Sequence, residues 1–356
     1  MNLTLLYSVY FIVAFIFSFL INGLFLRFSK NLGTRDTDIG QVRWSASSKP
    51  SLGGISFFIT FLLSVISYSM FFEQAAIFHD KQFTGILISC VAGFLMGLAD
   101  DAYNTKPILK FSVQFFCGVI LIFSGTYIQL FSNEYINYAI TLFWVVGIMN
   151  SINMLDNMDA ITTSVSIVIT LCFILIIFFY KEYTSIHLIV SLGVLSALLG
   201  FLYYNINPSK LYMGDTGSQF LGIFLAAMGV KYFWNFTDTG LVGIAAYPTK
   251  QIIVTLLIFI IPITDTTTVF INRIGKGQSP FIGGKDHTTH HLSYRGLSDR
   301  QVALAFTLIS LVSLFFIWII INFLQNWSIF YFILFLCYIL GVSGWLYYNT
   351  KTTKAQ

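Results

Sequence analysis

Residues 83–101, FTGILISCVAGFLMGLADD, show what kind of chain this is. An uncharged and mostly apolar run (83–99) is followed directly by two aspartates, Asp100 and Asp101. Apolar runs of about 20 residues are typical of helices that cross a bilayer, and a carboxylate left in hydrocarbon is costly. The sequence therefore predicts a membrane helix that ends near residue 100, where two adjacent acids need partners.

The composition of the whole chain agrees with this interpretation. Of the 356 residues, 56% are hydrophobic and only 10% are charged, and the mean hydropathy is +0.79. Soluble domains carry about 25% charged residues, so a soluble protein is excluded. The four cysteines lie inside apolar runs without metal or disulfide spacing, and we interpret them as small core residues. The net charge of +4 does not indicate a nucleic-acid partner, because the cations are sorted by loop.

We predict an all-α, polytopic integral membrane protein with about 11 transmembrane helices. The spans are expected near residues 3–26, 52–72, 83–99, 108–128, 137–155, 160–180, 185–204, 217–235, 249–271, 303–323 and 328–348. The first run is too long for a signal-peptide core and has no small-residue cleavage site, so we expect it to be retained. Residues 1–356 are expected to form a single membrane-embedded domain.

The positive charges predict the orientation. Of the 19 Lys and Arg residues, 15 fall in one alternating set of loops and in the tail after residue 348. The positive-inside rule makes this set cytoplasmic and puts the N-terminus outside and the C-terminus inside. The cytoplasmic loops are then residues 27–51, 100–110, 156–159, 205–216 and 272–302. Most of the acids lie in or near the same loops, so we expect the functional site there.

Three acids at span ends are candidates for chemistry. On a helix, Asp100 and Asp101 project about 100° apart, so one can face a cation while the other meets a substrate proton. The alternative is a pair of acids that marks a helix end in water. Asp215 lies between Gly214 and Gly217, where the backbone can approach a diphosphate and a carboxylate suits Mg²⁺. The alternative there is a glycine turn with an N-cap aspartate.

The segment MNSINMLDNMDAIT (149–162) spaces Asn150, Asn153, Asp156 and Asp159 three residues apart. On an ideal α-helix these side chains fan across about 180°, whereas a 3₁₀-like end would align them. Amides and carboxylates together can bind a hard cation or read hydroxyls and a base edge. A polar turn between two spans is the alternative.

The segment RIGKGQSPFIGGKDHTTHHLSYRG (273–296) contains His287, His290 and His291, a spacing that predicts one face of a helix. There is no His-Glu-x-x-His pattern and no nearby cysteine, so a zinc protease site is not indicated. With basic residues around it, the cluster predicts phosphate binding. Lys49, just before Pro50 and the second span, is either a further phosphate ligand or a solvated loop lysine.

Taken in chain order, GLADD (97–101), NSINMLDNMDA (150–160), YMGDTGSQFLG (212–222) and DHTTHH (286–291) resemble the signature segments of the polyprenyl-phosphate N-acetylhexosamine-1-phosphate transferases. The resemblance runs from Lys49 to about Arg295, roughly two thirds of the chain. It implies transfer from a cytoplasmic UDP-N-acetylhexosamine to a polyprenyl phosphate such as undecaprenyl phosphate, with release of UMP. It further implies Mg²⁺ as cofactor, with Mn²⁺ as the alternative, and a place in the inner (plasma) membrane, and it leaves a homodimer open.

The resemblance also implies roles for single residues. Asp100 and Asp101 correspond to the catalytic acids, and Asn153 and Asp215 to the metal-binding positions. The implied substrate-binding residues are Lys49, Asp156, Asp159, His287, His290 and His291.

The family has branches, and two features of this chain bear on the choice. The loop DHTTHH is similar to the branch that uses UDP-GlcNAc or related sugars for a cell-surface polysaccharide. The alternative is the peptidoglycan branch, which transfers phospho-MurNAc-pentapeptide and has three adjacent histidines after a proline. Ala160 stands where the family commonly has glycine, and the IGGK sequence after Ser279-Pro280-Phe281 is a second departure.

Two other classes of protein compete with the transferase. A transporter should place acids in mid-span with broken helices; only Asp265 lies about 10 Å inside a predicted span. An intramembrane aspartyl protease would need a second mid-helix acid. For the transferase, direct attack by the lipid phosphate and a phosphoryl-enzyme route both stay open. We favour direct attack, because such a phosphate, with a second pKa of about 6, needs little activation.

Overall fold

The computed structural model describes residues 3–32, 49–72, 80–236, 248–279 and 284–353. Within these residues the regular structure is helical throughout. The helices of the first part are α1 (Leu3–Leu32), α2 (Gly53–Phe71), α3 (Lys81–Tyr103), α4 (Pro107–Phe123), α5 (Glu134–Leu155), α6 (Ile161–Phe179) and α7 (Ile186–Asn205). Those of the second part are α8 (Gly214–Gly229) with its π-helical continuation η2 (Val230–Trp234), α9 (Pro248–Ile258), α10 (Ile260–Gly275), α11 (Thr288–Tyr294), α12 (Asp299–Phe323) and α13 (Ile329–Thr352).

The lengths and compositions of these helices confirm an all-α, polytopic membrane protein. Among the described residues, eight helices are long and apolar enough to cross a membrane, or nine if the bent pair α9 and α10 is one span. The apolar helix α4 is shorter, at 17 residues. Each predicted span overlaps one of the helices, but the count of 11 stays a prediction.

The ninth predicted span, residues 249–271, is wrong as a single helix. The chain forms α9 and α10 there, with axes bent by 80°. Pro262 explains the break, because proline has no N–H and its ring clashes with the carbonyl group four residues earlier. That carbonyl belongs to Ile258, which is the last residue of α9. A bent pair is one feature that we had associated with transporters.

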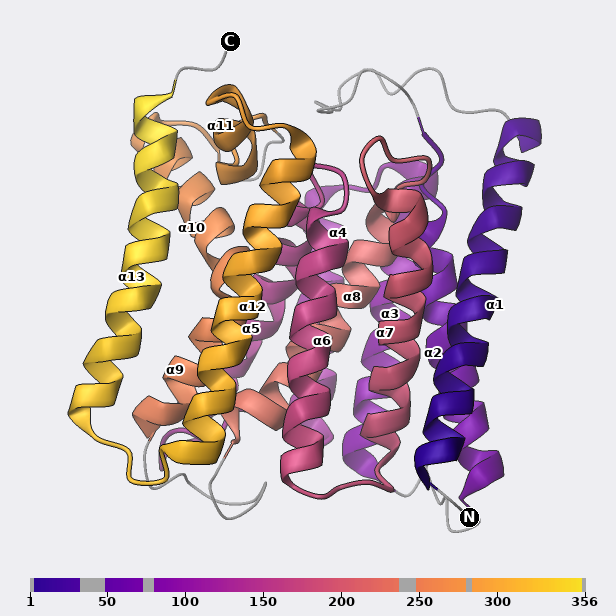
Figure 1. Ribbon diagram of the computed structural model, residues 1–356, viewed down its shortest axis with the longest axis horizontal. Helices are drawn as coiled ribbons and strands as arrows, with labels where there is room; N and C mark the ends of the chain where they lie inside the picture. Colours follow the sequence, from indigo (N-terminus) through magenta and orange to yellow (C-terminus); the bar gives the residue numbers. More distant parts are fainter. Residues whose placement is uncertain (1–2, 33–48, 73–79, 237–247, 280–283, 354–356) are drawn as a thin grey trace.

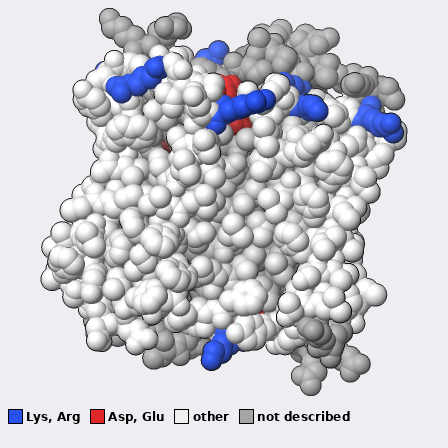
Figure 2. Space-filling model, in the orientation of Figure 1, with Lys and Arg blue, Asp and Glu red and all other residues white. Residues whose placement is uncertain are grey.

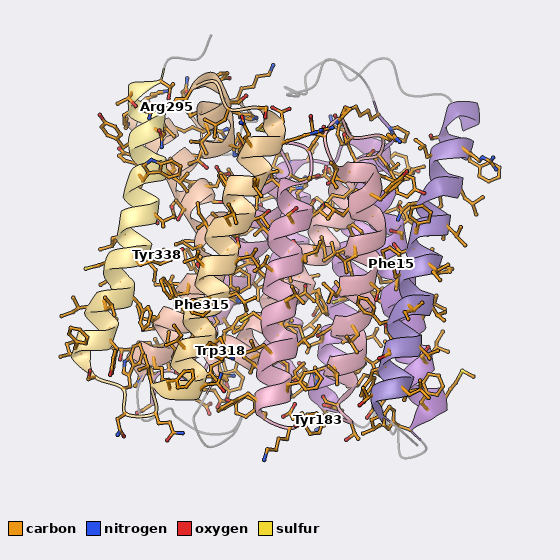
Figure 3. The ribbon with its side chains drawn as sticks, viewed as in Figure 1. Phe15, Tyr183, Arg295, Phe315, Trp318 and Tyr338 are labelled. Carbon is orange, nitrogen blue, oxygen red and sulfur yellow. The ribbon has the colours of Figure 1, made fainter. Side chains whose placement is uncertain are left out.

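The helices stand side by side around α8, while α1 and α13 form the two outer edges (Figure 1). Every residue of α8 from Thr216 to Gly229 is buried, and this helix packs against α2, α3 and α5. Helices α1 and α12 present apolar side chains on their outer surfaces instead. Phe15 on α1, and Phe315 and Trp318 on α12, are exposed (Figure 3). Exposed aromatic residues on a helix of this length suit contact with lipid.

Lys and Arg side chains gather along the upper edge of the molecule (Figure 2). We call this side, where α3 ends and α8 begins, the basic face. Helix α1 begins at the opposite face and α13 ends at the basic face (Figure 1). This arrangement suits termini on opposite sides of a membrane, and the assignment of the basic face to the cytoplasm stays a prediction. Most of the loop 27–51, and residues 280–283, lie outside the described residues.

Candidate active site

The two acidic segments of α3 and α8 meet because a glycine lets the helices touch. At Gly97, an added Cβ atom would lie 2.2 Å from the carbonyl oxygen of Asp215. No side chain fits there, so α3 approaches the first turn of α8 backbone to backbone. The contact sets the end of α3, with Asp100 and Asp101, directly beside Asp215.

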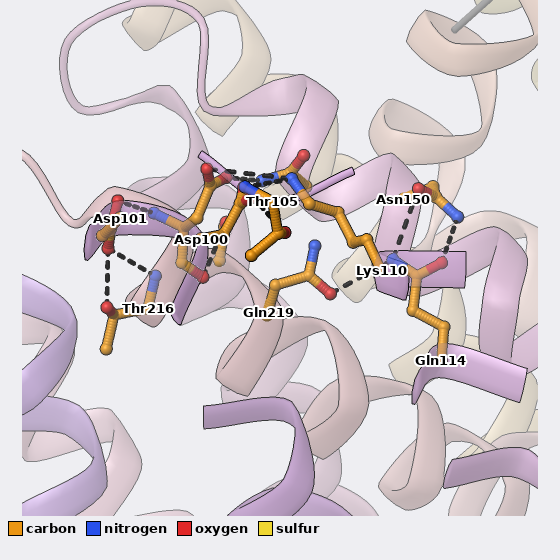
Figure 4. Close-up of polar contacts among 11 residues, drawn as sticks. Asp100, Asp101, Thr105, Lys110, Gln114, Asn150, Thr216 and Gln219 are labelled. Atoms are coloured by element: carbon orange, nitrogen blue, oxygen red, sulfur yellow. Dashed lines mark hydrogen bonds and ion pairs between the residues drawn. The ribbon is translucent and has the colours of Figure 1, made fainter. Parts of the chain in front are cut away.

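Asp101 binds the start of α8 (Figure 4). Its Oδ1 accepts a hydrogen bond from the Asp215 N–H at 3.0 Å, and its Oδ2 accepts from the N–H and Oγ1 of Thr216 at 2.8 and 2.6 Å. Gly214 makes room for this carboxylate, because it has a φ of +71° and an added Cβ would lie 2.6 Å from Asp101 Oδ2. A carboxylate at a helix N-terminus satisfies free N–H groups and complements the helix dipole.

Asp100 instead faces a cation, Lys110 of α4. Asp100 Oδ2 lies 2.5 Å from Lys110 Nζ, and its Oδ1 accepts from the N–H and Oγ1 of Thr105 at 2.9 and 2.5 Å. Lys110 Nζ is also 3.8 Å from Asp215 Oδ2. Lys110 was not among the predicted site residues, although a lysine within a predicted span (108–128) is a signal of function.

Asn153 and Asp215, the predicted metal pair, are brought together. The Asn153 amide nitrogen donates to Asp215 Oδ1, and to Ser218 Oγ at 2.8 Å. Helix α5 stays α-helical as far as Leu155, so the polar residues of segment 149–162 do not align on one point. Each takes its own partner. We call Asp100, Lys110, Asn153 and Asp215 the charged cluster.

Asp156 follows α5 as its C-cap and is partly buried. Burial raises the pKa of Asp156 to about 8, and the negative charges of Asp215 and Asp101 add to the effect. Lys110 lies near Asp215, but none of the groups that shift the pKa of Asp156 is a cation. A bound cation would supply positive charge and would return Asp156 to its ionised form.

Asp159 binds the turn that precedes α8 rather than the charged cluster. This buried carboxylate accepts from the N–H and Oγ of Ser209 at 3.0 and 2.8 Å, and from the Asn207 amide at 3.0 Å. Lys49 joins the group, with Nζ 3.0 Å from Ser209 Oγ and 4.0 Å from Asp159 Oδ2. The predicted substrate ligands Lys49 and Asp159 are therefore neighbours.

Ala160 adopts a backbone conformation that favours glycine. Its φ is +66°, in the left-handed region, just before α6 begins at Ile161. An L-residue pays roughly 1–2 kcal/mol for that conformation, which glycine adopts freely. The alanine here is buried and is held in a strained turn.

The histidine segment differs from the prediction of one helical face. Helix α11 has only seven residues, and His287 precedes it as the N-cap, with extended backbone. Asp265 of α10 fixes this geometry: its Oδ1 accepts from the N–H and Oγ1 of Thr288 at 2.8 and 2.6 Å. Its Oδ2 lies 2.8 Å from His287 Nδ1. Because a carboxylate only accepts, Nδ1 carries a proton and Nε2 is left for a ligand.

His290 and His291 lie inside α11 and are buried. Burial lowers the pKa of His290 to about 3, and the charge of His287 adds to this; burial and Lys276 lower the pKa of His291. Both rings are uncharged at neutral pH. They can contact a phosphate as neutral hydrogen-bonding groups, but not as the cations that a basic cluster implies.

Two contacts hold the histidine segment in place. Thr289 Oγ1 donates to Asn157 Oδ1 at 2.7 Å, which joins α11 to the turn after α5. Arg273 binds Asp286 in a two-bond ion pair, with Nε and a terminal nitrogen 2.7 and 2.6 Å from the carboxylate oxygens. Burial raises the pKa of Asp286, but its bond to Arg273 and the charge of Arg273 outweigh burial and lower it.

Comparison with known proteins gives the family. The family described as glycosyl transferase family 4 matches residues 83–233. A protein of Bacillus subtilis (strain 168), named a probable undecaprenyl-phosphate N-acetylglucosaminyl 1-phosphate transferase, is 30% identical over 301 residues, which cover 78% of each chain. The chain belongs to glycosyl transferase family 4.

Further relatives carry the names of two kinds of transferase. A phospho-N-acetylmuramoyl-pentapeptide-transferase of Thermoanaerobacter sp. (strain X514) is 27% identical over 333 residues, covering 85% of this chain and 95% of the relative. A decaprenyl-phosphate N-acetylglucosaminephosphotransferase of Mycobacterium leprae (strain TN) is 25% identical over 285 residues, covering 72% and 69%. The resemblance seen in the sequence is confirmed, and the protein is a membrane-embedded transferase.

The segment that matches glycosyl transferase family 4 runs from α3 to η2 and contains the whole charged cluster. Among the described residues, no three His, Cys, Asp or Glu side chains are grouped closely enough to hold a metal by themselves. Mg²⁺ commonly takes one or two carboxylates and completes its shell with water and substrate phosphate oxygens. The pair Asp215 and Asn153, next to the crowded carboxyl group of Asp156, fits Mg²⁺ on those terms.

Proposed function

We propose that the protein transfers GlcNAc-1-phosphate from UDP-GlcNAc to undecaprenyl phosphate, releases UMP and makes the first lipid-linked intermediate of a cell-surface polysaccharide. The observation that carries the proposal is the charged cluster itself: Lys110 lies between two carboxylates, Asp100 and Asp215, at one edge of a membrane bundle. Phosphoryl transfer requires such positioned charge rather than a dedicated covalent catalyst. The name of the Bacillus relative supports the sugar and the lipid.

In this reaction an oxygen of the lipid phosphate attacks the β-phosphorus of the UDP-sugar, and the bond from that phosphorus to the bridging oxygen of UMP breaks. Lys110 neutralises charge on the lipid phosphate. Asp100, with its other oxygen fixed by Thr105, holds the ammonium group in position. The lipid phosphate is mostly dianionic near neutral pH, with a second pKa of about 6, so the attack needs no strong base.

Asp215 and Asn153 would hold Mg²⁺ through a carboxylate and an amide oxygen. When bound, the ion neutralises the diphosphate of the nucleotide and eases the departure of UMP. An ion bound at Asp215 would also act on Asp156, because the charge of Asp215 already raises the pKa of Asp156. An all-oxygen donor set favours Mg²⁺ over Zn²⁺. Lys49, Asp159 and the three histidines remain the proposed contacts for the nucleotide sugar.

The test is transfer by purified protein in detergent, with undecaprenyl phosphate, Mg²⁺ and a panel of UDP-sugars, scored for UMP and lipid-linked product. UDP-GlcNAc should give both products, and excess EDTA should abolish them. Product from UDP-MurNAc-pentapeptide instead would place the protein in the peptidoglycan branch. Solute uptake by protein-containing liposomes without UMP release would favour a transporter.

A pair of variants separates the metal site from general damage. Asp215→Ala should be inactive but folded, whereas Glu134→Ala, an exposed acid at the opposite end of the bundle, should keep full activity. Transfer by Asp215→Ala with unchanged Mg²⁺ dependence would rule out this metal site.

We further propose that the basic face is cytoplasmic and that the protein lies in the plasma membrane. The gathering of Lys and Arg on that face supports this orientation (Figure 2). A cysteine introduced at Lys285 should resist membrane-impermeant thiol reagents in intact cells. Labelling of that cysteine from outside would contradict the cytoplasmic site.

A further inference from the structure

Three buried or partly buried amide side chains are hydrogen-bonded to one another beside the charged cluster (Figure 4). Gln114 of α4 donates to Gln219 Oε1 at 3.1 Å and to Asn150 Oδ1 at 3.3 Å. The Asn150 amide donates back to Gln114 Oε1 at 2.7 Å, and to a backbone carbonyl of its own helix. We call Gln114, Asn150 and Gln219 the amide layer.

The amide layer lies deeper in the bundle than the charged cluster on all three helices. Gln114 follows Lys110 by four residues, and Gln219 follows Asp215 by four; α4 and α8 both run away from the basic face. Asn150 precedes Asn153 by three residues on α5, which runs toward that face. Residues three or four apart share a helix face, and the step corresponds to about 5–6 Å.

One hydrogen-bond donor of this layer has no acceptor among the described residues. Gln219 is fully buried, and its Nε2 has no hydrogen-bond partner among the residues that the structure describes. Unpaired buried donors are rare because they lose water without compensation. In Figure 4 the Gln219 oxygen points to Gln114, and its nitrogen points to the side on which Asp100 and Lys110 meet.

The rest of the layer fixes the direction of that donor. Gln114 Nε2 can only donate, so it selects the oxygen of Gln219 and leaves the nitrogen turned away. Asn150 in turn holds Gln114 through both ends of its amide. The donor is therefore oriented before any ligand arrives, which lowers the entropy cost of binding.

We propose that Gln219 Nε2 donates a hydrogen bond to the phosphate of the lipid acceptor, and that the amide layer is the floor of the acceptor subsite on the bilayer side. This proposal rests on the proposed function. The acceptor phosphate is tied to a hydrocarbon chain in the bilayer, whereas the nucleotide sugar arrives from the aqueous basic face. A donor that lies deeper than Lys110 thus meets the lipid phosphate and not the diphosphate.

The test is the steady-state kinetics of Gln219→Met, which replaces the amide by an apolar side chain of similar length. The KM for undecaprenyl phosphate should rise about tenfold or more, as expected for a lost hydrogen bond to a charged group. The KM for UDP-GlcNAc should change less than about twofold, because only one substrate loses a contact. Gln219→Leu should behave alike.

Gln251→Met is the matched control. Gln251 is also a buried glutamine, but it lies on α9 and donates to the Phe236 carbonyl at 2.9 Å, near the opposite face. Its replacement should leave both KM values unchanged. Thermal unfolding completes the design. The substrate-free Gln219 variants should unfold within a few degrees of wild type, because they lose only the hydrogen bond from Gln114, whose Nε2 keeps its bond to Asn150.

Each result has a definite meaning. A wild-type enzyme that makes no lipid product would refute the proposed function before the variants are compared. An active Gln219→Met enzyme with a normal KM for the lipid, or with a raised KM for UDP-GlcNAc instead, would overturn the acceptor subsite alone. Failure of both Gln219 variants to fold would also overturn it, by showing that the residue is structural.

Discussion

Two aspartates on different helices each bind the start of another helix through the same pair of groups. Asp101 accepts from the N–H and Oγ1 of Thr216 at the start of α8, and Asp265 accepts from the N–H and Oγ1 of Thr288 at the start of α11. They differ in the second oxygen. In Asp101 it accepts a backbone N–H from Asp215, and in Asp265 it meets the His287 ring.

This difference in the second oxygen gives the two aspartates different roles. Asp101 uses both carboxylate oxygens to hold α8 against α3, and so positions Asp215 for others. Asp265 anchors α11 with one oxygen and fixes an ionisable ring with the other. A carboxylate that orients a histidine in this way sets which nitrogen is free. The family resemblance implies a catalytic role for Asp101, whereas Asp265 stands out in the sequence only as an acid inside a predicted span.

The largest effects should separate the adjacent acids of α3. We expect Asp100→Asn to lower turnover by two or more decades with little change in unfolding temperature, because Lys110 loses its partner while the helix contacts remain. Asp101→Asn should lower both turnover and stability, because its amide nitrogen would oppose a backbone N–H at the start of α8. Transfer assays and thermal unfolding measure the two effects. An Asp101→Asn protein with wild-type stability would contradict the anchoring role.

The second comparison concerns Asp265 and His287. Asp265→Asn keeps an oxygen for Thr288 but offers His287 Nδ1 a donor, so the ring must change tautomer. Turnover should fall about tenfold or more. In a double-mutant cycle, Asp265→Asn should add little to the loss caused by His287→Ala, because both act through one ring. Additive losses would show that Asp265 acts on activity by some other route.

A smaller effect on stability is expected when only the threonine hydroxyl that binds each aspartate is removed. Thr216→Val and Thr288→Val each remove the hydroxyl and keep the backbone N–H that Asp101 or Asp265 accepts. Each should lower the free energy of unfolding by about 1.5–3 kcal/mol, the usual contribution of one hydrogen bond to a charged group. Chemical denaturation in detergent measures it. Equal losses would indicate that both aspartates stabilise a helix start in the same way.

The smallest effect is expected at Ala160. Ala160→Gly relieves the left-handed strain before α6 and should raise the free energy of unfolding by up to about 1 kcal/mol, with activity retained. Ala197→Gly is the control, because Ala197 is buried inside α7 with helical backbone and should lose about 1 kcal/mol or more. If both variants lost stability alike, the backbone at Ala160 would not be strained.

The fold was predictable because apolar runs and sorted cations report on the bilayer directly. The apolar run 83–99 is long enough to cross a bilayer, so its length alone predicts α3. The break between α9 and α10 was missed, although Pro262 stood in the sequence. A proline bends one membrane helix and is tolerated in another, and only packing around Phe259 distinguishes the two outcomes.

The site was predictable in its members but not in its pairings. Asp100, Asn153 and Asp215 were candidates from residue type and spacing, the family resemblance implied their roles, and the structure brings them together. Lys110 was counted only as a loop cation, and Gln114 and Gln219 drew no notice inside apolar runs. These residues belong to the candidate site through contacts between α4, α5 and α8, which are distant in sequence. Spacing along one helix carries no information on what faces it from another.

The bend at Pro262 sets the direction about the helix axis in which the following residues of α10 point. Phe259 is held at the corner, with ring centroids 4.9 Å from Trp144 and 6.0 Å from Phe233, so the start of α10 cannot rotate freely. Every residue added to a helix turns the next one by about 100°. One extra residue between Pro262 and Asp265 would therefore aim the carboxylate away from His287, with every chemical group still present. The corner fixes the rotational phase at which α10 meets the histidine.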